Sequence, residues 1–483
     1  MNKKPIRIFI HAILVLFTAS FPLFAFNLHV EGNLLKDENG TAVRLTGVNW
    51  FGLETTNMCP HGLWARDWKG MLLQVKDMGF NCIRLPWCDA MLRNGATASS
   101  INFYGVDPYR KNATTDMNKE LVGKSPLEIM DIIVGGCAEL GIAVVLDNHS
   151  REPDGYMNEQ VWYTAKTSEQ QWIDDWVFLA SRYKNNPAVV GCDLDNEPHG
   201  SASSGGSQWG GGNLLFDWKS AAQRCGNAIL AVNPDILIVV EGVEQFGTTN
   251  YWWGGNLRGV RTDPIVLTNP AKLVYSPHEY GPEVFNQTWF GDPAFPGNLP
   301  TIWDSAFAFI KNENKGHLLL GEFGIRDRSS FSGKQGTWFS TLLSTLCKSI
   351  SWTFWCLNPN SGDTGGLLEN DWTTPVQWKL DMLKPCMAPL LGIATANLNH
   401  TFFKKRNSQI TISLFHDRIV LNGLNEGKHE LVISSVDGKT LIQQPIFEPT
   451  ISLSSLGLVS SVYTIMVYGG NNETSIKKIV ILK

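Results

Sequence analysis

From about residue 43 to residue 390, short apolar runs alternate with segments whose apolar residues recur every three to four positions. Most of the apolar runs are continuous, which is typical of parallel strands covered by helices. Eight of them predict strands, at residues 43–50, 81–87, 143–149, 188–198, 236–242, 273–280, 317–324 and 349–358.

The segments between these strands carry helical patterns, at residues 67–79, 125–141, 167–184, 214–232, 303–315, 335–348 and 375–390. Ser125, Pro126 and Glu128 have the spacing of a capping box with proline in the first turn. Only the stretch between the fifth and sixth strands lacks a clear helical pattern. The alternation predicts an α/β fold, a (β/α)8 TIM barrel.

Beyond about residue 395 the pattern changes to short strands separated by Gly, Asn and Asp turns. All 18 tryptophans lie before residue 379. We therefore expect the (β/α)8 barrel, as the catalytic domain, at 26–394. A short linker at 395–408 and a small all-β sandwich domain at 409–483 would follow it. The predicted strands of this domain are 409–415, 418–424, 429–438, 440–447, 462–470 and 475–483.

The first residues combine a basic start, at Lys3, Lys4 and Arg7, with a short apolar run and a small residue, Ala25, before a plausible cleavage point. The run is short for a stable membrane span. It predicts a signal peptide at 1–25 and a secreted or cell-surface protein. An uncleaved anchor is the alternative.

The overall charge excludes one class of partner. The net charge is −5, and "KKR" at 404–406 is the densest basic run, so we expect no nucleic-acid binding.

Nine cysteines are present, and Cys59 with Cys88 is one pairing that export would permit. Cys82, Cys192 and Cys356 lie in predicted core strands as apolar side chains. Without CxxC spacing, we expect no metal site and no cofactor.

Polar residues collect where the predicted strands end, which is where barrel enzymes place their active sites. Glu197 ends the fourth strand and Glu322 the seventh, so the two can face each other across the barrel mouth. Two facing carboxyls suit glycoside hydrolysis, with retention at roughly 5 to 5.5 Å and inversion at about 6.5 to 9.5 Å. At the shorter distance one carboxyl keeps its proton, because adjacent anions repel.

Two segments, "LDNEPHG" (194–200) and "LLLGEFG" (318–324), resemble the acid/base and nucleophile signatures of glycoside hydrolase family 5. The resemblance covers roughly residues 28 to 392. "YWWGGNLRGV" (251–260) and "VYSPHEYGPEVFNQTWF" (274–290) are similar to its endo-β-1,4-glucanase (cellulase) branch. The family set is matched in order by Arg84, His149, Asn196, Glu197, His278, Tyr280, Glu322 and Trp355.

The resemblance implies a role for each matched position. Glu197 would be the acid/base, Glu322 the nucleophile, and Asn196 a partner of the sugar 2-hydroxyl. The other matched residues would support them: Arg84 and Tyr280 by holding Glu322 ionised, His278 by tuning Glu197, His149 by contacting a sugar hydroxyl, and Trp355 by stacking under the sugar.

Several other residues near the strand ends need an interpretation. Asp193 and Asp195 are expected to pair with arginines or backbone donors, and Asp147 to support the rim. Glu241, Glu244 and Glu279 do not match the motif pair. Four loop tryptophans are candidates for sugar-stacking subsites, with simple loop packing as the alternative: Trp64, Trp162, Trp209 and Trp253.

These residues predict a monomeric, retaining endo-β-1,4-glucanase whose partner is a β-linked glucan polysaccharide. A β-mannanase, xyloglucanase or β-1,3-glucanase on the same fold remains open, as does a non-catalytic glycan-binding barrel. The C-terminal segment ends in "KKIVILK" and resembles the sorting domains of the type IX secretion system, which implies a secretion machinery as partner. A stabilising or sugar-binding domain is the alternative.

Overall fold

The computed structural model describes residues 27–110, 115–326 and 328–391, together with seven strands between residues 411 and 481. The chain divides into two compact units, 1–393 and 394–483, which are described separately. The predicted signal peptide (1–25) and linker (395–408) lie outside the described residues. None of the described helices is long and apolar enough to cross a membrane.

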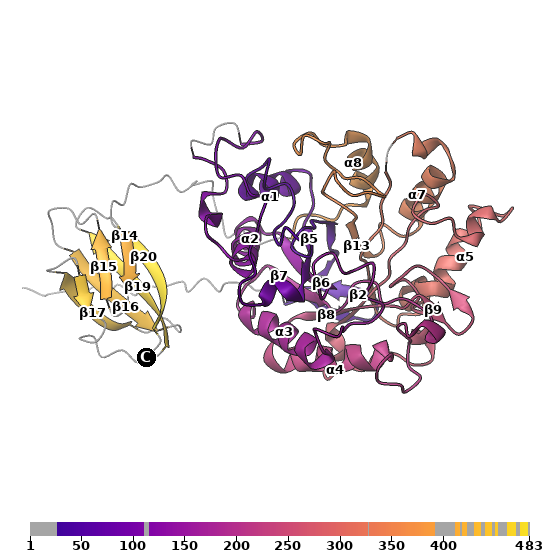
Figure 1. The fold of residues 1–483 in the computed structure, drawn as a ribbon, viewed down its shortest axis with the longest axis horizontal. Coiled ribbons are helices and arrows are strands. Elements are labelled where there is room, and N and C mark those ends of the chain that lie inside the picture. Colours follow the sequence, from indigo (N-terminus) through magenta and orange to yellow (C-terminus); the bar gives the residue numbers. More distant parts are fainter. Residues whose placement is uncertain are drawn as a thin grey trace, which may run out of the picture. The chain divides into compact units, whose positions relative to one another are not determined.

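The first unit contains a closed barrel of eight parallel strands, which confirms the predicted fold (Figure 1). Successive barrel strands of the chain are neighbours in the sheet, and the last pairs with the first. The strands are β4 (Thr46–Asn49), β5 (Cys82–Cys88), β6 (Ala143–Ser150), β7 (Val189–Asp193), β8 (Leu237–Glu241), β11 (Leu273–Ser276), β12 (His317–Leu320) and β13 (Ser351–Phe354).

Helices connect the strands much as predicted. They are α1 (Trp68–Asp77), α2 (Pro126–Leu140), α3 (Glu169–Arg182), α4 (Trp218–Val232), α5 (Leu299–Trp303), α6 (Phe309–Asn312), α7 (Lys334–Thr345) and α8 (Gln377–Leu383). A π-helical turn, Asp304–Ala308, joins α5 to α6. The capping box is confirmed, because Ser125 Oγ accepts from the Glu128 N–H and the Glu128 carboxylate accepts from the Ser125 N–H.

The connection between β8 and β11 is described throughout and contains no α-helix, as the sequence predicted. It holds a hairpin of β9 (Gln245–Phe246) and β10 (Thr249–Asn250) and two 3-10 helices, Arg258–Arg261 and Pro270–Lys272. Other 3-10 helices occur at Asp89–Leu92, Lys119–Leu121, Ala202–Ser204, Thr288–Gly291, Ser330–Ser332 and Lys384–Cys386.

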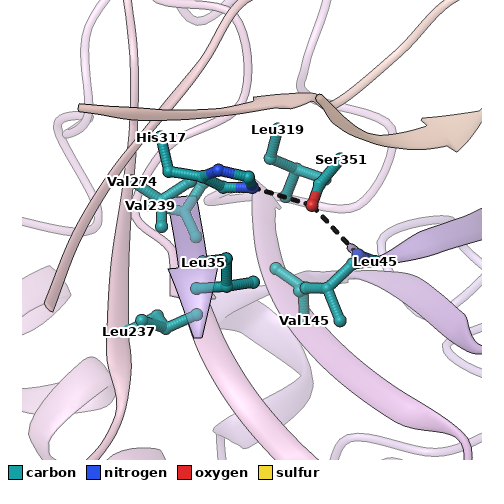
Figure 2. Close-up of a pocket in the computed structure, with 9 residues that line it drawn as sticks. All are labelled: Leu35, Leu45, Val145, Leu237, Val239, Val274, His317, Leu319 and Ser351. Atoms are coloured by element: carbon teal, nitrogen blue, oxygen red, sulfur yellow. Dashed lines mark hydrogen bonds between the residues drawn. The ribbon is translucent and has the colours of Figure 1, made fainter. Parts of the chain in front are cut away.

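A small antiparallel sheet of β1 (His29–Glu31), β2 (Leu34–Lys36) and β3 (Ala42–Val43) packs at the N-terminal end of the barrel. Leu35 from β2 lines a small, mainly apolar pocket there with the first residues of several barrel strands (Figure 2). His317 Nδ1–H donates to the Asn33 carbonyl at 3.0 Å, and its Nε2 accepts from Ser351 Oγ at 2.8 Å. This end of a barrel serves stability rather than catalysis.

The cysteine pairing suggested by the sequence is wrong. Cys59 and Cys88 are free and buried, and each thiol contacts a backbone carbonyl, of Ser99 and Leu53 respectively. The disulfide instead joins Cys347 to Cys386, with their Cα atoms 5.3 Å apart. Cys82, Cys192 and Cys356 are buried free thiols in or next to the barrel strands, as expected.

The described strands of the second unit form two antiparallel sheets, in agreement with the expected all-β fold. One sheet has the order β14–β15–β18 and the other β17–β16–β19–β20. All six predicted strands are present, and β18 is an additional one. Their bounds are β14 (Thr411–Phe415), β15 (Arg418–Asn422), β16 (His429–Ser435), β17 (Thr440–Ile446), β18 (Thr450–Ser452), β19 (Ser461–Gly469) and β20 (Thr474–Ile481).

Candidate active site

Two glutamates face each other at the C-terminal end of the barrel. Glu197 follows β7 and Glu322 follows β12. A carboxylate oxygen of each and one ring nitrogen of His278 all lie within 4.8 Å of one another. The Glu197 side chain is 17% exposed and that of Glu322 is 5% exposed, so both border solvent from a mostly buried position. The spacing agrees with the roughly 5 to 5.5 Å of a retaining carboxyl pair.

Glu322 is held by two donors. Arg84 Nη1 donates to Oε1 at 2.8 Å, and the Tyr280 hydroxyl donates to Oε2 at 2.6 Å. These two donors fix both oxygens of Glu322, so its carboxyl group is held in one orientation.

Arg84 is the centre of the charge network beneath the site. It is fully buried and contacts four carboxylates, at 2.8 to 3.0 Å: Asp147, Asp193, Glu241 and Glu322. Burial alone would lower the pKa of Arg84, but these carboxylates raise it well above its ordinary value. Arg84 therefore stays charged and compensates part of the acidic cluster.

The acidic residues before Glu197 pair with arginines, as the sequence predicted. Asp193 Oδ2 accepts from Arg84 Nε at 2.8 Å. Asp195 Oδ1 accepts from Arg151 Nη1 at 2.5 Å. Asn196 Oδ1 accepts from Arg84 Nη2 at 3.0 Å, so the amide presents its Nδ2 hydrogens to another acceptor.

Glu197 depends on contacts different from those of Glu322. His278 Nδ1 lies 2.8 Å from Glu197 Oε1, and His278 Nε2 lies 3.2 Å from Glu241 Oε1. The backbone of Glu197 has a φ of +54°, in the left-handed region that non-glycine residues seldom adopt. Its N–H donates to Glu241 Oε2 at 2.8 Å, and its carbonyl accepts from His199 Nδ1 at 2.8 Å.

An aromatic surface borders the two glutamates. The ring of Trp355 is nearly parallel to that of His149, at 5.4 Å between centroids and 8°, and to that of Phe51, at 5.6 Å and 13°. Asp147 was expected to support the rim, and its Oδ2 accepts from His149 Nδ1 at 2.6 Å, which orients the histidine ring. Trp355 itself is partly exposed.

The four loop tryptophans divide into two groups. Trp64 is 36% exposed and packs edge-on against Trp372, and the partly exposed Trp253 stacks on His199 at 3.8 Å and 10°. Trp162 and Trp209 are buried, so the expectation that they stack on sugars is wrong. Their Nε1 atoms donate to Glu169 Oε2 and to the Asp263 carbonyl, both at 2.9 Å, which turns the rings into the protein.

Sequence reasoning missed two buried carboxyls near the site. Glu241 does not match the motif pair, yet it contacts Arg84, His278 and the Glu197 backbone. Its position at the end of β8 was the available signal. Glu54 follows β4, accepts from the Gly52 N–H at 2.7 Å, and has a pKa raised to about 7 by burial.

A closed (β/α)8 barrel with two glutamates facing each other at the strand ends defines a glycoside hydrolase. Residues 36–361 match the family model described as Cellulase (glycosyl hydrolase family 5), and the chain belongs to this family.

Relatives with similar sequences carry consistent names. The chain is 46% identical over 370 residues to an "Endoglucanase" of Paenibacillus polymyxa, covering 76% of this chain and 88% of the relative. It is 41% identical over 373 residues to the "Major extracellular endoglucanase" of Xanthomonas campestris pv. campestris, covering 76% of this chain and 72% of the relative.

Solved structures give the same result. The catalytic domain of the major endoglucanase from Xanthomonas campestris pv. campestris matches with a TM-score of 0.67 and 39% identity, over 74% of this chain and 99% of that one. A cellotetraose complex of an endocellulase variant from Pyrococcus horikoshii matches with a TM-score of 0.66 and 39% identity, over 74% and 98%. The protein is thus an enzyme of the endoglucanase type.

Proposed function

We propose that this endo-β-1,4-glucanase cleaves internal bonds of a cellulose-like glucan with retention of configuration, through Glu197 and Glu322. The observation that carries the proposal is the approach of the two carboxylates within 4.8 Å. That spacing is shorter than the roughly 6.5 to 9.5 Å that an inverting pair needs for a separate attacking water, which favours retention. The endoglucanase names of the relatives and the cellotetraose complex of the similar structure support the substrate class.

The reaction has two displacements. Glu322 attacks the anomeric carbon while the glycosidic C–O bond breaks, and Glu197 gives its proton to the departing oxygen. Water then attacks the glycosyl–enzyme ester from the opposite side. Glu197 takes a proton from that water, and the Glu322 carboxylate departs, so both groups return to their starting states.

The remaining matched residues bind the sugar or hold the pair. Asn196 donates to the 2-hydroxyl through Nδ2, and Trp355 stacks under the ring at the cleavage site. His149 contacts a hydroxyl of the same sugar. Trp64 and Trp253 extend the binding surface along the chain, because both present partly exposed rings.

Two substitutions test the catalytic assignment on a soluble cellulose derivative and on aryl cellobiosides. Glu322→Gln should abolish turnover of all substrates. Glu197→Ala should impair substrates with poor leaving groups far more than activated aryl glycosides, because only the former require protonation. The exposed Glu369→Gln is the matched control and should keep full activity. Near-normal activity of Glu322→Gln would reject the assignment.

The polysaccharide is tested separately. A panel of carboxymethylcellulose, mannan, xyloglucan and laminarin distinguishes a β-1,4-glucanase from the mannanase, xyloglucanase and β-1,3-glucanase alternatives. Preference for the cellulose derivative supports the proposal. A non-catalytic glycan-binding barrel would bind one of these polymers without releasing reducing ends, and the intact carboxylate pair argues against it.

We also propose that residues 409–483 direct export of a monomeric enzyme through a type IX-like machinery, after a signal peptide at 1–25. The strand pattern ending in "KKIVILK" supports this proposal. Deleting residues 400–483 should leave an active enzyme in the periplasm. Normal export with weaker retention on insoluble polymer would instead indicate a sugar-binding domain, and normal export with lower stability a stabilising domain.

A further inference from the structure

Glu241 occupies a fully buried position directly beneath the two glutamates. It ends β8, and its backbone carbonyl accepts from Trp218 Nε1 at 2.8 Å, which anchors the main chain there. The carboxylate is too deeply buried to touch a substrate. It therefore can influence the reaction only through the groups that it contacts.

Both oxygens of Glu241 are engaged by parts of the catalytic apparatus. Oε1 accepts from Arg84 Nη2 at 3.0 Å and lies 3.2 Å from His278 Nε2. Oε2 accepts from the backbone N–H of Glu197 at 2.8 Å. Glu241 thus contacts the acid/base residue itself and the histidine that pairs with its side chain.

A glycine provides the space that the Glu241 carboxylate occupies. Gly254 packs over it with a φ of +64°, and a Cβ at this position would collide with Glu241 Oε2. The same glycine faces the Cα of Glu197. The contact with the Glu197 N–H also helps to hold that residue at its φ of +54°, a conformation that non-glycine residues seldom adopt unless their surroundings fix it.

We propose that Glu241 is a positioning residue for general acid/base catalysis: it fixes the backbone of Glu197 and, through His278, the direction of the Glu197 carboxyl. This inference rests on the proposed role of Glu197. It predicts that a substitution of Glu241 slows proton transfer to the leaving group more than it slows nucleophilic attack.

The electrostatics agree with this role. Burial raises the pKa of Glu241 to about 8, the His278 charge opposes the rise, and Asp193 adds to it. Burial lowers the pKa of His278, but Glu241 and Glu322 raise it well above its ordinary value. Glu197 and Glu241 therefore face the two ring nitrogens of His278, at Nδ1 and Nε2 respectively.

Glutamine at position 241 would have nearly the same shape but one acceptor oxygen too few. The Oε1 site faces Arg84 and His278, so the amide oxygen is best placed there. The amide NH2 then faces the Glu197 N–H, and two donors oppose each other in a buried position. In Glu241→Gln the backbone N–H of Glu197 therefore loses its acceptor.

The matched control is Glu279→Gln. Glu279 is also fully buried and adjoins His278 in the chain, but its oxygens accept from the Tyr251 hydroxyl and from Trp338 Nε1. Glutamine there also leaves one donor without its acceptor. It reproduces the cost of a buried amide without a contact to Glu197.

The experiment compares kcat/KM for cellotetraose and 2,4-dinitrophenyl cellobioside in the full-length wild type, Glu241→Gln, Glu241→Asp and Glu279→Gln. For Glu241→Gln we expect a loss of about 100-fold on cellotetraose and less than about 5-fold on the activated glycoside, since acid catalysis contributes on the order of 100-fold or more. Glu279→Gln should lower the Tm and leave the ratio of the two substrates unchanged.

Equal losses on both substrates, or no loss on either, would overturn the inference while leaving the proposed function intact. A wild type that hydrolyses neither substrate would overturn the proposed function instead. If Glu241→Gln does not fold, Glu241→Asp decides: it keeps a carboxyl group but withdraws that group from the Glu197 N–H. A selective loss on cellotetraose then supports the role, and an equal loss rejects it.

Discussion

Tyr280 donates its hydroxyl hydrogen to Glu322 Oε2 at 2.6 Å, on the side of the carboxylate opposite to Arg84. Burial raises the pKa of Tyr280, and the charge of Glu322 raises it further, so the phenol stays protonated at any working pH. Tyr280 is therefore a permanent donor. It holds the proposed nucleophile in one orientation during attack and releases part of that bond as the ester forms.

Removing this donor should impair catalysis without unfolding the protein. Tyr280→Phe is expected to lower kcat/KM by about 10- to 100-fold, the value of one hydrogen bond to a charged group. Tyr275→Phe is the control, because Tyr275 is a buried tyrosine of β11 whose hydroxyl accepts from the Ile265 N–H. A Tyr280→Phe variant as active as Tyr275→Phe would contradict the role of Tyr280.

The stack of Trp253 on His199 should bind a sugar on the leaving-group side, because His199 contacts the Glu197 backbone. Trp253→Ala is expected to raise KM for cellohexaose by about 10-fold, equivalent to about 1.4 kcal/mol of stacking. Trp378→Ala provides the comparison, since this partly exposed ring packs on Phe331 instead. Equal KM values for the two variants would exclude a subsite at Trp253.

Glu54 should make stability depend on pH. Burial raises its pKa to about 7, although the His149 charge and the Gly52 N–H lower it. Because the folded pKa lies above the ordinary value of 4.5, the stabilising contribution is full below pH 4.5 and is lost as the pH rises through about 7. The shift corresponds to about 3 kcal/mol.

Glu54→Gln mimics the protonated carboxyl at every pH. We expect its free energy of unfolding, relative to the wild type, to rise by about 3 kcal/mol between pH 5 and pH 8. Urea unfolding followed by tryptophan fluorescence measures this difference, with Glu369→Gln as the control. A constant difference across this pH range would show that Glu54 is ionised throughout.

The floor of the barrel should contribute to stability alone. Ser351→Ala removes the hydroxyl that donates to His317 Nε2 and accepts from the Leu45 N–H, leaving two buried groups unpaired. The expected loss is about 2 to 4 kcal/mol in the free energy of unfolding, with unchanged kcat/KM. Ser344→Ala, on the exposed face of α7, should change stability by less than about 0.5 kcal/mol. A kinetic defect in Ser351→Ala would contradict this separation.

The barrel could be predicted because each strand carries its own signal. Buried apolar runs such as 143–149 end in polar residues, and parallel pairing brings those ends to one rim. The site residues on that rim could therefore be named from the sequence. The pairing of Asp193 and Asp195 with arginines could also be anticipated, because buried carboxylates require partners.

The errors arose where a side chain's direction depends on contacts that form only in the folded structure. Nothing near Trp162 in the sequence indicates that Glu169 draws its indole inward. The disulfide joins Cys347, which follows α7, to Cys386, which follows α8, and a sequence separation of 39 residues gives no local signal of their proximity. The contacts of Glu241 likewise come from residues that follow or lie on other strands, so the motif alone does not indicate them.

The stereochemistry of the first product tests the central claim most directly. Proton NMR of cellohexaose hydrolysis, recorded faster than mutarotation, reports the anomer that the enzyme releases. Carboxylates within 4.8 Å of each other predict that the β-anomer appears first and the α-anomer only later. Initial release of the α-anomer would mean inversion by a single displacement, and Glu322 could not be the nucleophile.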